Sequence, residues 1–261
     1  MESQANDKAK TPLNQLYREK NTFQDYPEVK KIYDDIHKFT VDRELFKDPY
    51  FKRPIGRIYD QAVLYQAVPN WEGLTVCELG GRDGVFGSWI TGQAKEVHVS
   101  DYFEEWGKGT EHDLGSFEYW SKIWKDAATN PDRLKCGVED ITKLSFPDNT
   151  FDVVICTSVI EHLHNQCEWQ GDMVGIRECA RILKPGGYLL LSTDMTDKKS
   201  KWCSGTFYFD GVDIFDRLIN PSRCKLVGDH NFDFNDSNNS DAREFPPIGA
   251  TVSSVVFALQ K

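Results

Sequence analysis

The sequence predicts an α/β fold, in which a doubly wound and mostly parallel sheet carries helices on both faces. From Leu74 onward, short apolar runs alternate with segments of helical periodicity, which is the pattern of parallel strands joined by crossover helices. The run 151–156 is almost continuously apolar, as expected of a strand that is buried on both faces. A glycine-rich turn also joins the first of these strands to a helix.

About seven segments have the length and the flanking turn residues of strands. They are residues 74–79, 96–100, 133–138, 151–156, 187–192, 225–229 and 251–259. Between them we expect helices near residues 85–92, 169–183 and 212–218. A long aromatic connection is expected over residues 102–132, and a loop over the Asn-, Asp- and Ser-rich residues 231–241.

The first 70 residues are different in character, because they are polar and aromatic with helical spacing only in places. Helices are expected at residues 27–38 and 55–67, and Pro69-Asn70 ends the second of them. We therefore divide the chain into an N-terminal helical appendage, residues 1–70, and an α/β domain, residues 71–261.

Composition restricts the possible partners. The net charge is −10, which argues against duplex nucleic acid because phosphate binding requires a basic surface. No apolar run is long enough to cross a bilayer, and the first residues lack the apolar core of a secretory signal. The seven cysteines include no Cys-x-x-Cys pair, so we expect reduced thiols in a cytoplasmic protein.

The glycine-rich turn after the first strand is the first candidate binding element. Its residues are Glu78-Leu-Gly80-Gly81-Arg82-Asp83-Gly84. The dinucleotide fingerprint Gly-x-Gly-x-x-Gly is excluded, because it would need glycine at Arg82 or Asp83. Such a turn allows the backbone to approach a ligand closely, or it is simply a tight connection. The Glu78 carboxylate can fix either a ligand's ammonium group or the amides of the turn itself.

Two aspartates follow along the chain. Asp101 ends the second strand, where a carboxylate is suited to bind both hydroxyls of a ribose; the alternative is a local turn or capping role. Asp140 precedes the fourth strand, where it can accept a hydrogen bond from an adenine amino group or remain a solvated loop residue.

Taken together and in order, Glu78-x-Gly80, Asp101, Asp140, the run 151–155 and Leu183-Lys-Pro-Gly-Gly-Tyr-Leu-Leu-Leu resemble the class I S-adenosylmethionine-dependent methyltransferases. The resemblance covers residues 74–259 and is greatest to small-molecule and glycan methyltransferases. It implies a Rossmann-like sheet with an antiparallel last strand, and S-adenosylmethionine as cofactor. Arg82 departs from the pattern, because the family often has glycine there; the arginine then narrows the turn or contacts the cofactor's carboxylate.

The resemblance also implies a set of cofactor contacts. The glycines line the methionine part, Asp101 holds the ribose, Asp140 and Ile141 meet the adenine, and Thr157 lies beside the methionine end. The expected cofactor-binding residues are Glu78, Gly80, Gly81, Arg82, Gly84, Asp101, Tyr102, Asp140, Ile141 and Thr157.

Methyl transfer to a hydroxyl needs a base near the carboxyl ends of the strands. His162 is the first candidate, because an imidazole titrates near neutrality; a local hydrogen bond at a helix start is the alternative. Glu161 and Asp194 are the next candidates. Glu161-His162 also resembles part of a Glu-x-x-Glu-His metal site of some methyltransferases. The first glutamate position is Ser158 here, which leaves too few ligands, and we expect no metal.

The acceptor is the least determined part. We favour O-methylation of a small molecule, with a sugar or glycan as acceptor, because residues 191–194 and the segment beginning at Trp202 are similar to those of glycan-pathway methyltransferases. That segment can equally be a surface loop, and the aromatic residues of 102–124 are either an acceptor wall or core. The alternatives are methylation of a protein or RNA end, and a cofactor-binding partner subunit without turnover.

Overall fold

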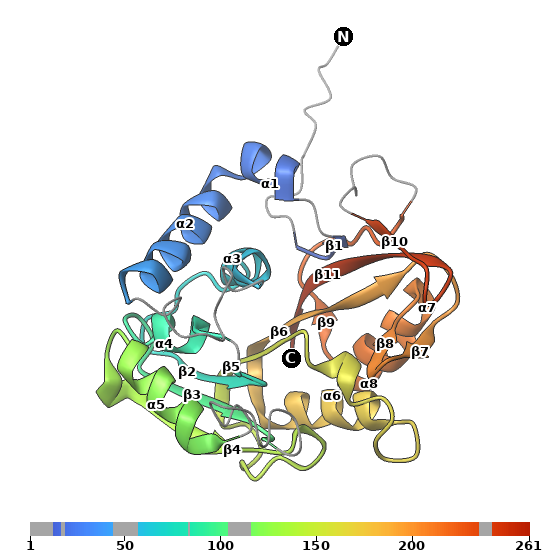
Figure 1. Cartoon of the computed structure of the whole chain (residues 1–261). Helices are drawn as coiled ribbons and strands as arrows, with labels where there is room; N and C mark the ends of the chain where they lie inside the picture. Colours follow the sequence, from blue (N-terminus) through green and yellow to red (C-terminus); the bar gives the residue numbers. More distant parts are fainter. Residues whose placement is uncertain (1–12, 17–18, 44–56, 83, 104–115, 235–241) are drawn as a thin grey trace.

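The fold is built on one central sheet with helices on both faces (Figure 1), described by a computed structural model for residues 13–16, 19–43, 57–82, 84–103, 116–234 and 242–261. The sheet order is β1-β11-β6-β5-β2-β3-β4. Its main strands are β2 (Thr75–Leu79), β3 (Glu96–Asp101), β4 (Leu134–Val138), β5 (Phe151–Thr157), β6 (Leu183–Thr196) and β11 (Ala250–Gln260). Neighbouring strands from β4 to β6 run parallel, and β11 is antiparallel to β6. The predicted doubly wound sheet with an antiparallel last strand is confirmed.

The outer edge of β11 is covered by three short antiparallel strands. They are β1 (Gln15–Leu16), β9 (Lys225–Leu226) and β10 (Arg243–Phe245), each paired with a different stretch of β11. The N-terminal segment thus adds a strand to the sheet as well as helices. The domain boundary at residue 70 remains a prediction.

Helices cover the sheet in two sets (Figure 1). One set comprises α1 (Glu19–Asp25), α2 (Pro27–Asp42), α3 (Ile58–Tyr65), α4 (Phe86–Ile90) and α5 (Phe117–Ala127). The other comprises α6 (Gly171–Ile182), α7 (Gly211–Asp213), the π-helical η5 (Ile214–Ile219) and α8 (Asn220–Ser222).

The two sets of helices enclose separate cores on the two faces of the sheet. On β5, Val153 and Ile155 point into the core that contains α3, α4 and α5, whereas Val154 and Cys156 point into the core that contains α6. All four side chains are fully buried. Because side chains alternate along a strand, burial on both faces requires every position to be apolar. This explains the continuous apolar run in the sequence.

Helix α5 corrects the expectation of a long connection over residues 102–132. Ser116 caps this helix by accepting a hydrogen bond from the backbone N–H of Tyr119. Trp120 and Trp124 are fully buried in the core. These two aromatic residues therefore pack the core and do not form an acceptor wall. Trp106, in the same segment, lies outside the described residues.

The segment beginning at Trp202 forms a two-stranded hairpin of β7 (Lys201–Cys203) and β8 (Thr206–Tyr208). Ser204 and Gly205 connect the strands with φ angles of 51° and 85°. Two successive positive φ angles fit a type I′ turn, whose twist matches that of a tight hairpin.

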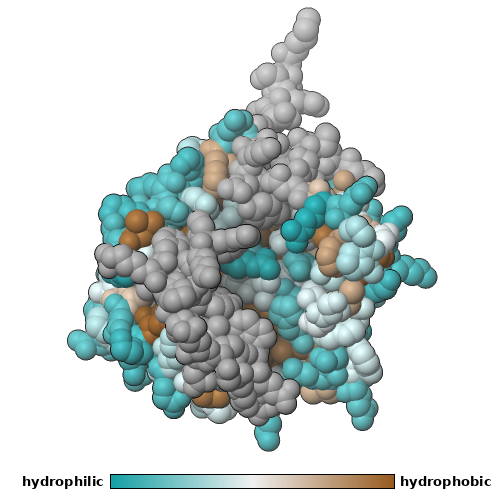
Figure 2. Space-filling model, viewed as in Figure 1, coloured by the Kyte–Doolittle hydropathy of each residue, from teal (hydrophilic) through white to brown (hydrophobic). Residues whose placement is uncertain are grey.

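The described part of the surface in Figure 2 is mostly hydrophilic, with hydrophobic residues in small separate areas. Five large hydrophobic residues are exposed among the described ones: Val41, Tyr102, Val138, Trp169 and Val212. No described helix combines the length and the apolar character that crossing a membrane would require.

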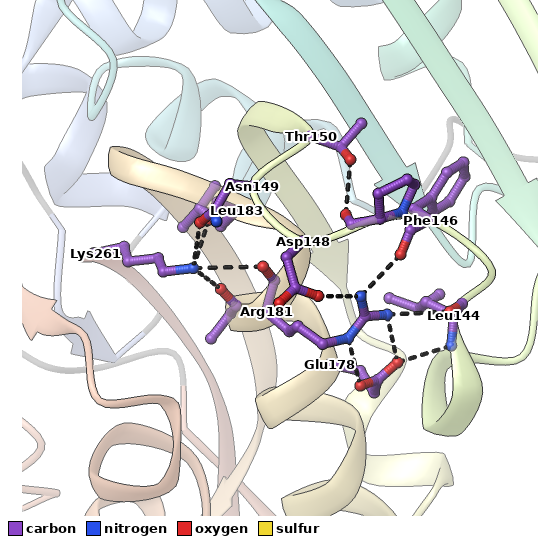
Figure 3. A network of polar contacts seen from close by, with 11 residues as sticks. Leu144, Phe146, Asp148, Asn149, Thr150, Glu178, Arg181, Leu183 and Lys261 are labelled. Carbon is purple, nitrogen blue, oxygen red and sulfur yellow. Dashed lines mark hydrogen bonds and ion pairs between the residues drawn. The ribbon is translucent and has the colours of Figure 1, made fainter.

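Polar contacts join the end of α6 to the loop before β5 and to the last residue, Lys261 (Figure 3). Arg181 donates to both carboxylate oxygens of Glu178 at 2.8 Å and to the carbonyl oxygens of Leu144 and Phe146 at 3.0 and 2.8 Å. The Nζ atom of Lys261 donates to the carbonyl oxygens of Ala180 and Leu183 at 2.8 and 2.6 Å. The Lys261 contacts satisfy carbonyls that the end of α6 leaves without intrahelical partners. The Arg181 contacts join the helix to the loop before β5.

We expect Arg181→Met to lower the free energy of unfolding by about 1–3 kcal/mol, because it removes hydrogen bonds to a carboxylate and two carbonyls together. Arg177→Met is the matched control, since Arg177 is an exposed arginine one turn earlier on α6; its effect should stay within about 0.5 kcal/mol. Equilibrium urea unfolding measures both. If the two substitutions lowered the free energy of unfolding equally, the stabilising role of the Arg181 hydrogen bonds would be contradicted.

Candidate active site

A cleft of about 280 Å³ opens beside the carboxyl ends of β2 and β5. Strand β2 has β3 on one side and β5 on the other, so the strand order reverses there, and ligands of open α/β sheets bind at such a switch point. The lining residues come from the start of α3, the turn after β2, and the end of β5 with the short helix η4 (Ile160–His162). They are Arg57, Gln61, Glu78, Gly80, Arg82, Gly84, Thr157, Ser158 and His162.

The turn after β2 requires its glycines for steric reasons. Gly80 has φ +71°, and a Cβ atom on it would lie 2.2 Å from Cγ2 of Val159. A Cβ on Gly81 would lie 2.4 Å from Cγ1 of Val99. Gly80 and Gly84 line the cleft, whereas Gly81 packs against β3 and is not among the lining residues. The backbone itself therefore forms this wall of the cleft.

Glu78 holds the turn and the first residues of α4. Its carboxylate accepts a hydrogen bond of 2.8 Å from the backbone N–H of Gly87, which is the second of the two roles considered for it. Burial raises the pKa of Glu78 from 4.5 to about 7, and the bond from Gly87 opposes this rise. A buried carboxyl group therefore lies in the cleft wall, ready to ionise near neutral pH.

Asp101 and Arg82 form an ion pair beside the turn. A carboxylate oxygen of Asp101 lies 3.0 Å from a terminal guanidinium nitrogen of Arg82, and the other accepts from the Arg82 backbone N–H at 3.2 Å. The backbone N–H of Tyr102 donates to the same carboxylate at 2.8 Å. Arg82 thus contacts the residue that is expected to hold ribose. Because the Arg82 guanidinium occupies one carboxylate oxygen of Asp101, it must move before Asp101 can accept hydrogen bonds from both ribose hydroxyls.

Arg57, next to the start of α3, is one of the two arginines that line the cleft. Its guanidinium lies 3.2 Å from a carboxylate oxygen of Asp60 and 3.2 Å from the Ser254 hydroxyl, and it also donates to the Ser158 hydroxyl. Burial lowers the pKa of Arg57, but the carboxylates of Asp60, Glu161 and Asp194 outweigh this effect and raise it.

The carboxylates around Arg57 are themselves buried. Asp60 and Glu161 are at most 1 % exposed, and burial raises the pKa of each. Glu161 accepts hydrogen bonds from the hydroxyls of Ser158 and Thr193 at 2.6 and 3.0 Å. Asp194 is half-buried and accepts from the Ser254 hydroxyl at 3.3 Å. Neither Glu161 nor Asp194 lines the cleft; both lie in the charged layer around Arg57.

Two buried polar atoms at the cleft have no hydrogen-bond partner among the described residues. They are Oε1 of Gln61 and the Thr157 hydroxyl, and both residues line the cleft. Because buried polar atoms are almost always paired, these atoms indicate a polar ligand. An amide oxygen beside a guanidinium fits the ammonium and carboxylate of an amino-acid group.

His162 lines the cleft at the end of η4. Its Nδ1 lies 2.8 Å from the carbonyl oxygen of Gly205 in the β7–β8 turn. A carbonyl only accepts, so Nδ1 carries the proton of the neutral ring and Nε2 is left as the basic nitrogen. The ring is exposed, and the local hydrogen bond therefore orients it without using its basic atom.

The adenine-binding residues are not brought to this cleft. Asp140 caps the short helix η3 (Ile141–Lys143) by accepting from the backbone N–H and the hydroxyl of Thr142 at 2.8 and 2.7 Å. Ile141 is buried in the core on the α6 side. Their contact with adenine remains a prediction. Within the described ranges, no group of three His, Cys, Asp or Glu side chains is placed to hold a metal ion.

Sequence reasoning missed Arg57, Gln61 and Ser158, which all line the cleft. The first two belong to the segment that we expected to be an appendage. One signal was present, since Asp60-Gln61 interrupts an otherwise apolar helix, and polar residues on a buried helix need partners.

Comparison with known proteins identifies the family. Residues 96–191 match the model of a methyltransferase domain family. A probable S-adenosylmethionine-dependent methyltransferase of Mycobacterium tuberculosis is 28% identical over 133 residues, which are 51% of this chain and 40% of that protein. These matches confirm the resemblance to the class I S-adenosylmethionine-dependent methyltransferases, and the family model covers residues 96–191 of the chain. The cofactor of this methyltransferase domain is S-adenosylmethionine.

Solved structures share the fold of this methyltransferase domain. A putative methyltransferase of Bacillus halodurans, 16% identical, superposes with a TM-score of 0.55 over 77% of this chain and 98% of that chain. The 1,6-didemethyltoxoflavin-N1-methyltransferase of Burkholderia thailandensis, 15% identical, reaches 0.53 over 91% and 89%. The chain spans 40% of the length of the first curated relatives that it matches.

The buried carboxyl of Glu78 gives this methyltransferase domain a specific pH dependence of stability. The folded state keeps the Glu78 proton between pH 4.5 and about 7, whereas the unfolded state has lost it. The contribution is therefore present below pH 4.5 and is lost as the pH rises through 7. We expect Glu78→Gln, which can still accept from Gly87, to reduce the fall in stability between about pH 5 and pH 8 by up to about 3 kcal/mol. Urea unfolding across this range measures it, and an unchanged slope would refute the role of Glu78.

Proposed function

We propose that this chain transfers the methyl group of S-adenosylmethionine to a hydroxyl group of a small molecule, with a sugar as the favoured acceptor. The observation that carries the proposal is His162, a histidine on the cleft wall whose Nδ1 is engaged by the carbonyl oxygen of Gly205. This hydrogen bond leaves Nε2 free to take a proton from an acceptor hydroxyl.

The cleft supports a defined placement of the methionine part of the cofactor. The guanidinium of Arg57 pairs with the α-carboxylate, and Oε1 of Gln61 accepts from the α-ammonium, which gives this buried amide oxygen a partner. Gly80 and Gly84 let the backbone approach the chain of the amino acid. Ionised Glu78 adds a negative charge that favours the ammonium and the sulfonium.

The ribose is assigned to Asp101, and Arg82 moves from this carboxylate when the cofactor enters. Tyr102 follows Asp101 directly and is exposed at the same edge of the sheet. Asp140 and Ile141 are assigned to the adenine by the family resemblance. These placements rest on the order of the residues along the edge of the sheet.

When bound, the cofactor supplies an electrophilic methyl group: the C–O bond forms as the C–S bond breaks, and the electron pair of that bond leaves with sulfur as S-adenosylhomocysteine. His162 takes the hydroxyl proton at Nε2 and later returns it to water. Glu161 and Asp194 act through Arg57, because they hold its charge in place beneath the cleft. Their role is positioning, since neither lines the cleft.

A hydroxyl acceptor is favoured by the presence of an oriented base. A neutral amine that already carries a free lone pair requires no proton transfer before attack, so the histidine would be superfluous for it. The sugar preference rests on the similarity of residues 191–194 in β6 and of the segment beginning at Trp202 to glycan-pathway enzymes. The acidic net charge of −10 counts against an RNA end as the acceptor.

We expect His162→Asn to lower kcat by about 10²–10⁴-fold, because general base catalysis is lost. The asparagine amide retains a donor toward Gly205, so the affinity for S-adenosylhomocysteine should be unchanged. His230→Asn is the matched control, since His230 is also an exposed histidine but does not line the cleft.

The assay incubates the protein with isotopically labelled S-adenosylmethionine and a panel of hydroxylated small molecules, and reads the gain of one labelled methyl by mass spectrometry. Unchanged turnover in His162→Asn would remove this residue from the mechanism. Cofactor binding without methylation of any acceptor would favour a partner subunit without turnover.

A further inference from the structure

Four aromatic side chains outside the cleft lining cluster around the β7–β8 hairpin, whose turn contacts His162, and the cofactor does not explain them. Trp169, Trp202, His164 and Phe207 are named here the aromatic corner. The rings of Trp169 and Trp202 are nearly perpendicular, at 87°, with centroids 6.2 Å apart. His164 stacks on Phe207 with centroids 3.6 Å apart, and its centroid lies 5.8 Å from that of Trp169 and 5.9 Å from that of Trp202.

The corner is open to solvent on the side of Trp169. This residue is 56 % exposed, which is unusual for an indole on a mostly hydrophilic surface. Trp202 is half-buried, whereas His164 and Phe207 are buried. An exposed indole and a half-buried indole therefore stand at a right angle on a packed base of two further rings.

The backbone that carries Trp169 is strained. Cys167, Glu168 and Trp169 have φ angles of 47°, 58° and 67°. The left-handed region is costly for residues other than glycine, and three successive residues in it are rare. Strain of this kind persists where the surrounding structure fixes it, often at ligand-binding segments.

A buried ion pair fixes the strained segment. Arg217 donates to both carboxylate oxygens of Asp172 at 2.7 and 2.8 Å, and Asp172 is fully buried. The same guanidinium donates to the carbonyl oxygen of Trp169 at 3.0 Å. At the other end, a Cβ on Gly171 would lie 1.9 Å from the carbonyl oxygen of Leu163. The turn cannot relax without breaking these contacts, so the exposed indole is held in position.

The corner carries no net charge. The charge of Arg217 is matched by that of Asp172. Nδ1 of His164 lies 3.1 Å from a guanidinium nitrogen of Arg217 and 3.4 Å from a carboxylate oxygen of Asp172, so it contacts both members of this ion pair. Burial, the largest effect, lowers the pKa of His164 and favours its neutral state. The ligand that fits is therefore neutral, with an apolar face.

The corner and the proposed base belong to the same two segments. His164 lies two residues after His162, and Trp202 and Phe207 lie opposite each other on β7 and β8. The turn of that hairpin is the one whose Gly205 carbonyl accepts from His162. A ligand on the aromatic corner thus contacts the same hairpin whose turn orients His162.

We propose that the aromatic corner is the acceptor subsite and that it binds a neutral pyranose ring, a proposal that rests on the methyltransferase function proposed above. The C–H face of a pyranose is weakly positive and packs on the electron-rich face of one indole, while the second indole contacts the edge of the ring. Hydroxyl groups on the outer edge stay in water or turn toward the cleft. A planar heterocycle fits two perpendicular indoles less well, because it stacks on only one of them. An anionic sugar fits less well because the corner carries no net positive charge.

The test uses the full chain saturated with S-adenosylhomocysteine and a panel of neutral methyl pyranosides as probes. Saturation-transfer NMR should show transfer to the C–H protons of at least one pyranoside. We expect Trp169→Ala to weaken that binding at least tenfold while the affinity for S-adenosylhomocysteine changes less than twofold. Val212→Ala is the control, since Val212 is also an exposed hydrophobic residue, and it should change neither.

A second variant distinguishes a loss of pyranoside binding from a loss of the folded state. Trp169→Gly removes the indole and also relieves the positive φ, so we expect pyranoside binding to be lost while the Tm does not fall. Full pyranoside binding in either Trp169 variant would overturn the proposal. Failure of every pyranoside to bind to the cofactor-loaded protein would overturn it as well, and would leave the methyltransferase function standing. Failure of S-adenosylhomocysteine itself to bind would instead refute the proposed function.

Discussion

The guanidinium of Arg57 is the interaction on which the site depends. It lies among Asp60, Glu161 and Asp194, so one positive charge compensates three nearby carboxylates. Its contacts join the start of α3 to the residue after β5 and to the middle of β11. Charges buried in this way stabilise the fold only while each keeps its partner. Helix α3 is therefore part of the wall of the cleft, through Arg57 at its start and Gln61.

The site combines this charge with local features that cost free energy of folding. Glu78 is buried with a raised pKa. On the other side of η4, three consecutive left-handed residues end at an exposed indole. Such features reduce stability and persist because the surrounding core fixes them. They occur on both sides of His162, where a cofactor and an acceptor must be brought together.

The sequence was sufficient for the sheet and for most of the turn after β2, because both are encoded locally. The continuous apolar run made β5 recognisable, because its side chains are buried on both faces, and Arg82 and Asp83 excluded the dinucleotide fingerprint. Arg57 and Gln61 were missed because their role arises only when α3 packs at the edge of the sheet, which no local pattern reveals. The periodicity of α5 was present in Phe117, Trp120 and Trp124, but the sequence alone left their aromatic side chains open between an acceptor wall and the core.

The central claim is that the cleft at the switch point of the sheet holds S-adenosylmethionine, and isothermal titration calorimetry with S-adenosylhomocysteine tests it most directly. The account predicts one molecule bound per chain, with binding lost in Gly80→Ala, because the added Cβ would meet Val159 and deform the turn. Circular dichroism on the same variant verifies that the fold is retained. Absence of binding to the wild-type chain, or unchanged binding in a folded Gly80→Ala variant, would contradict the account.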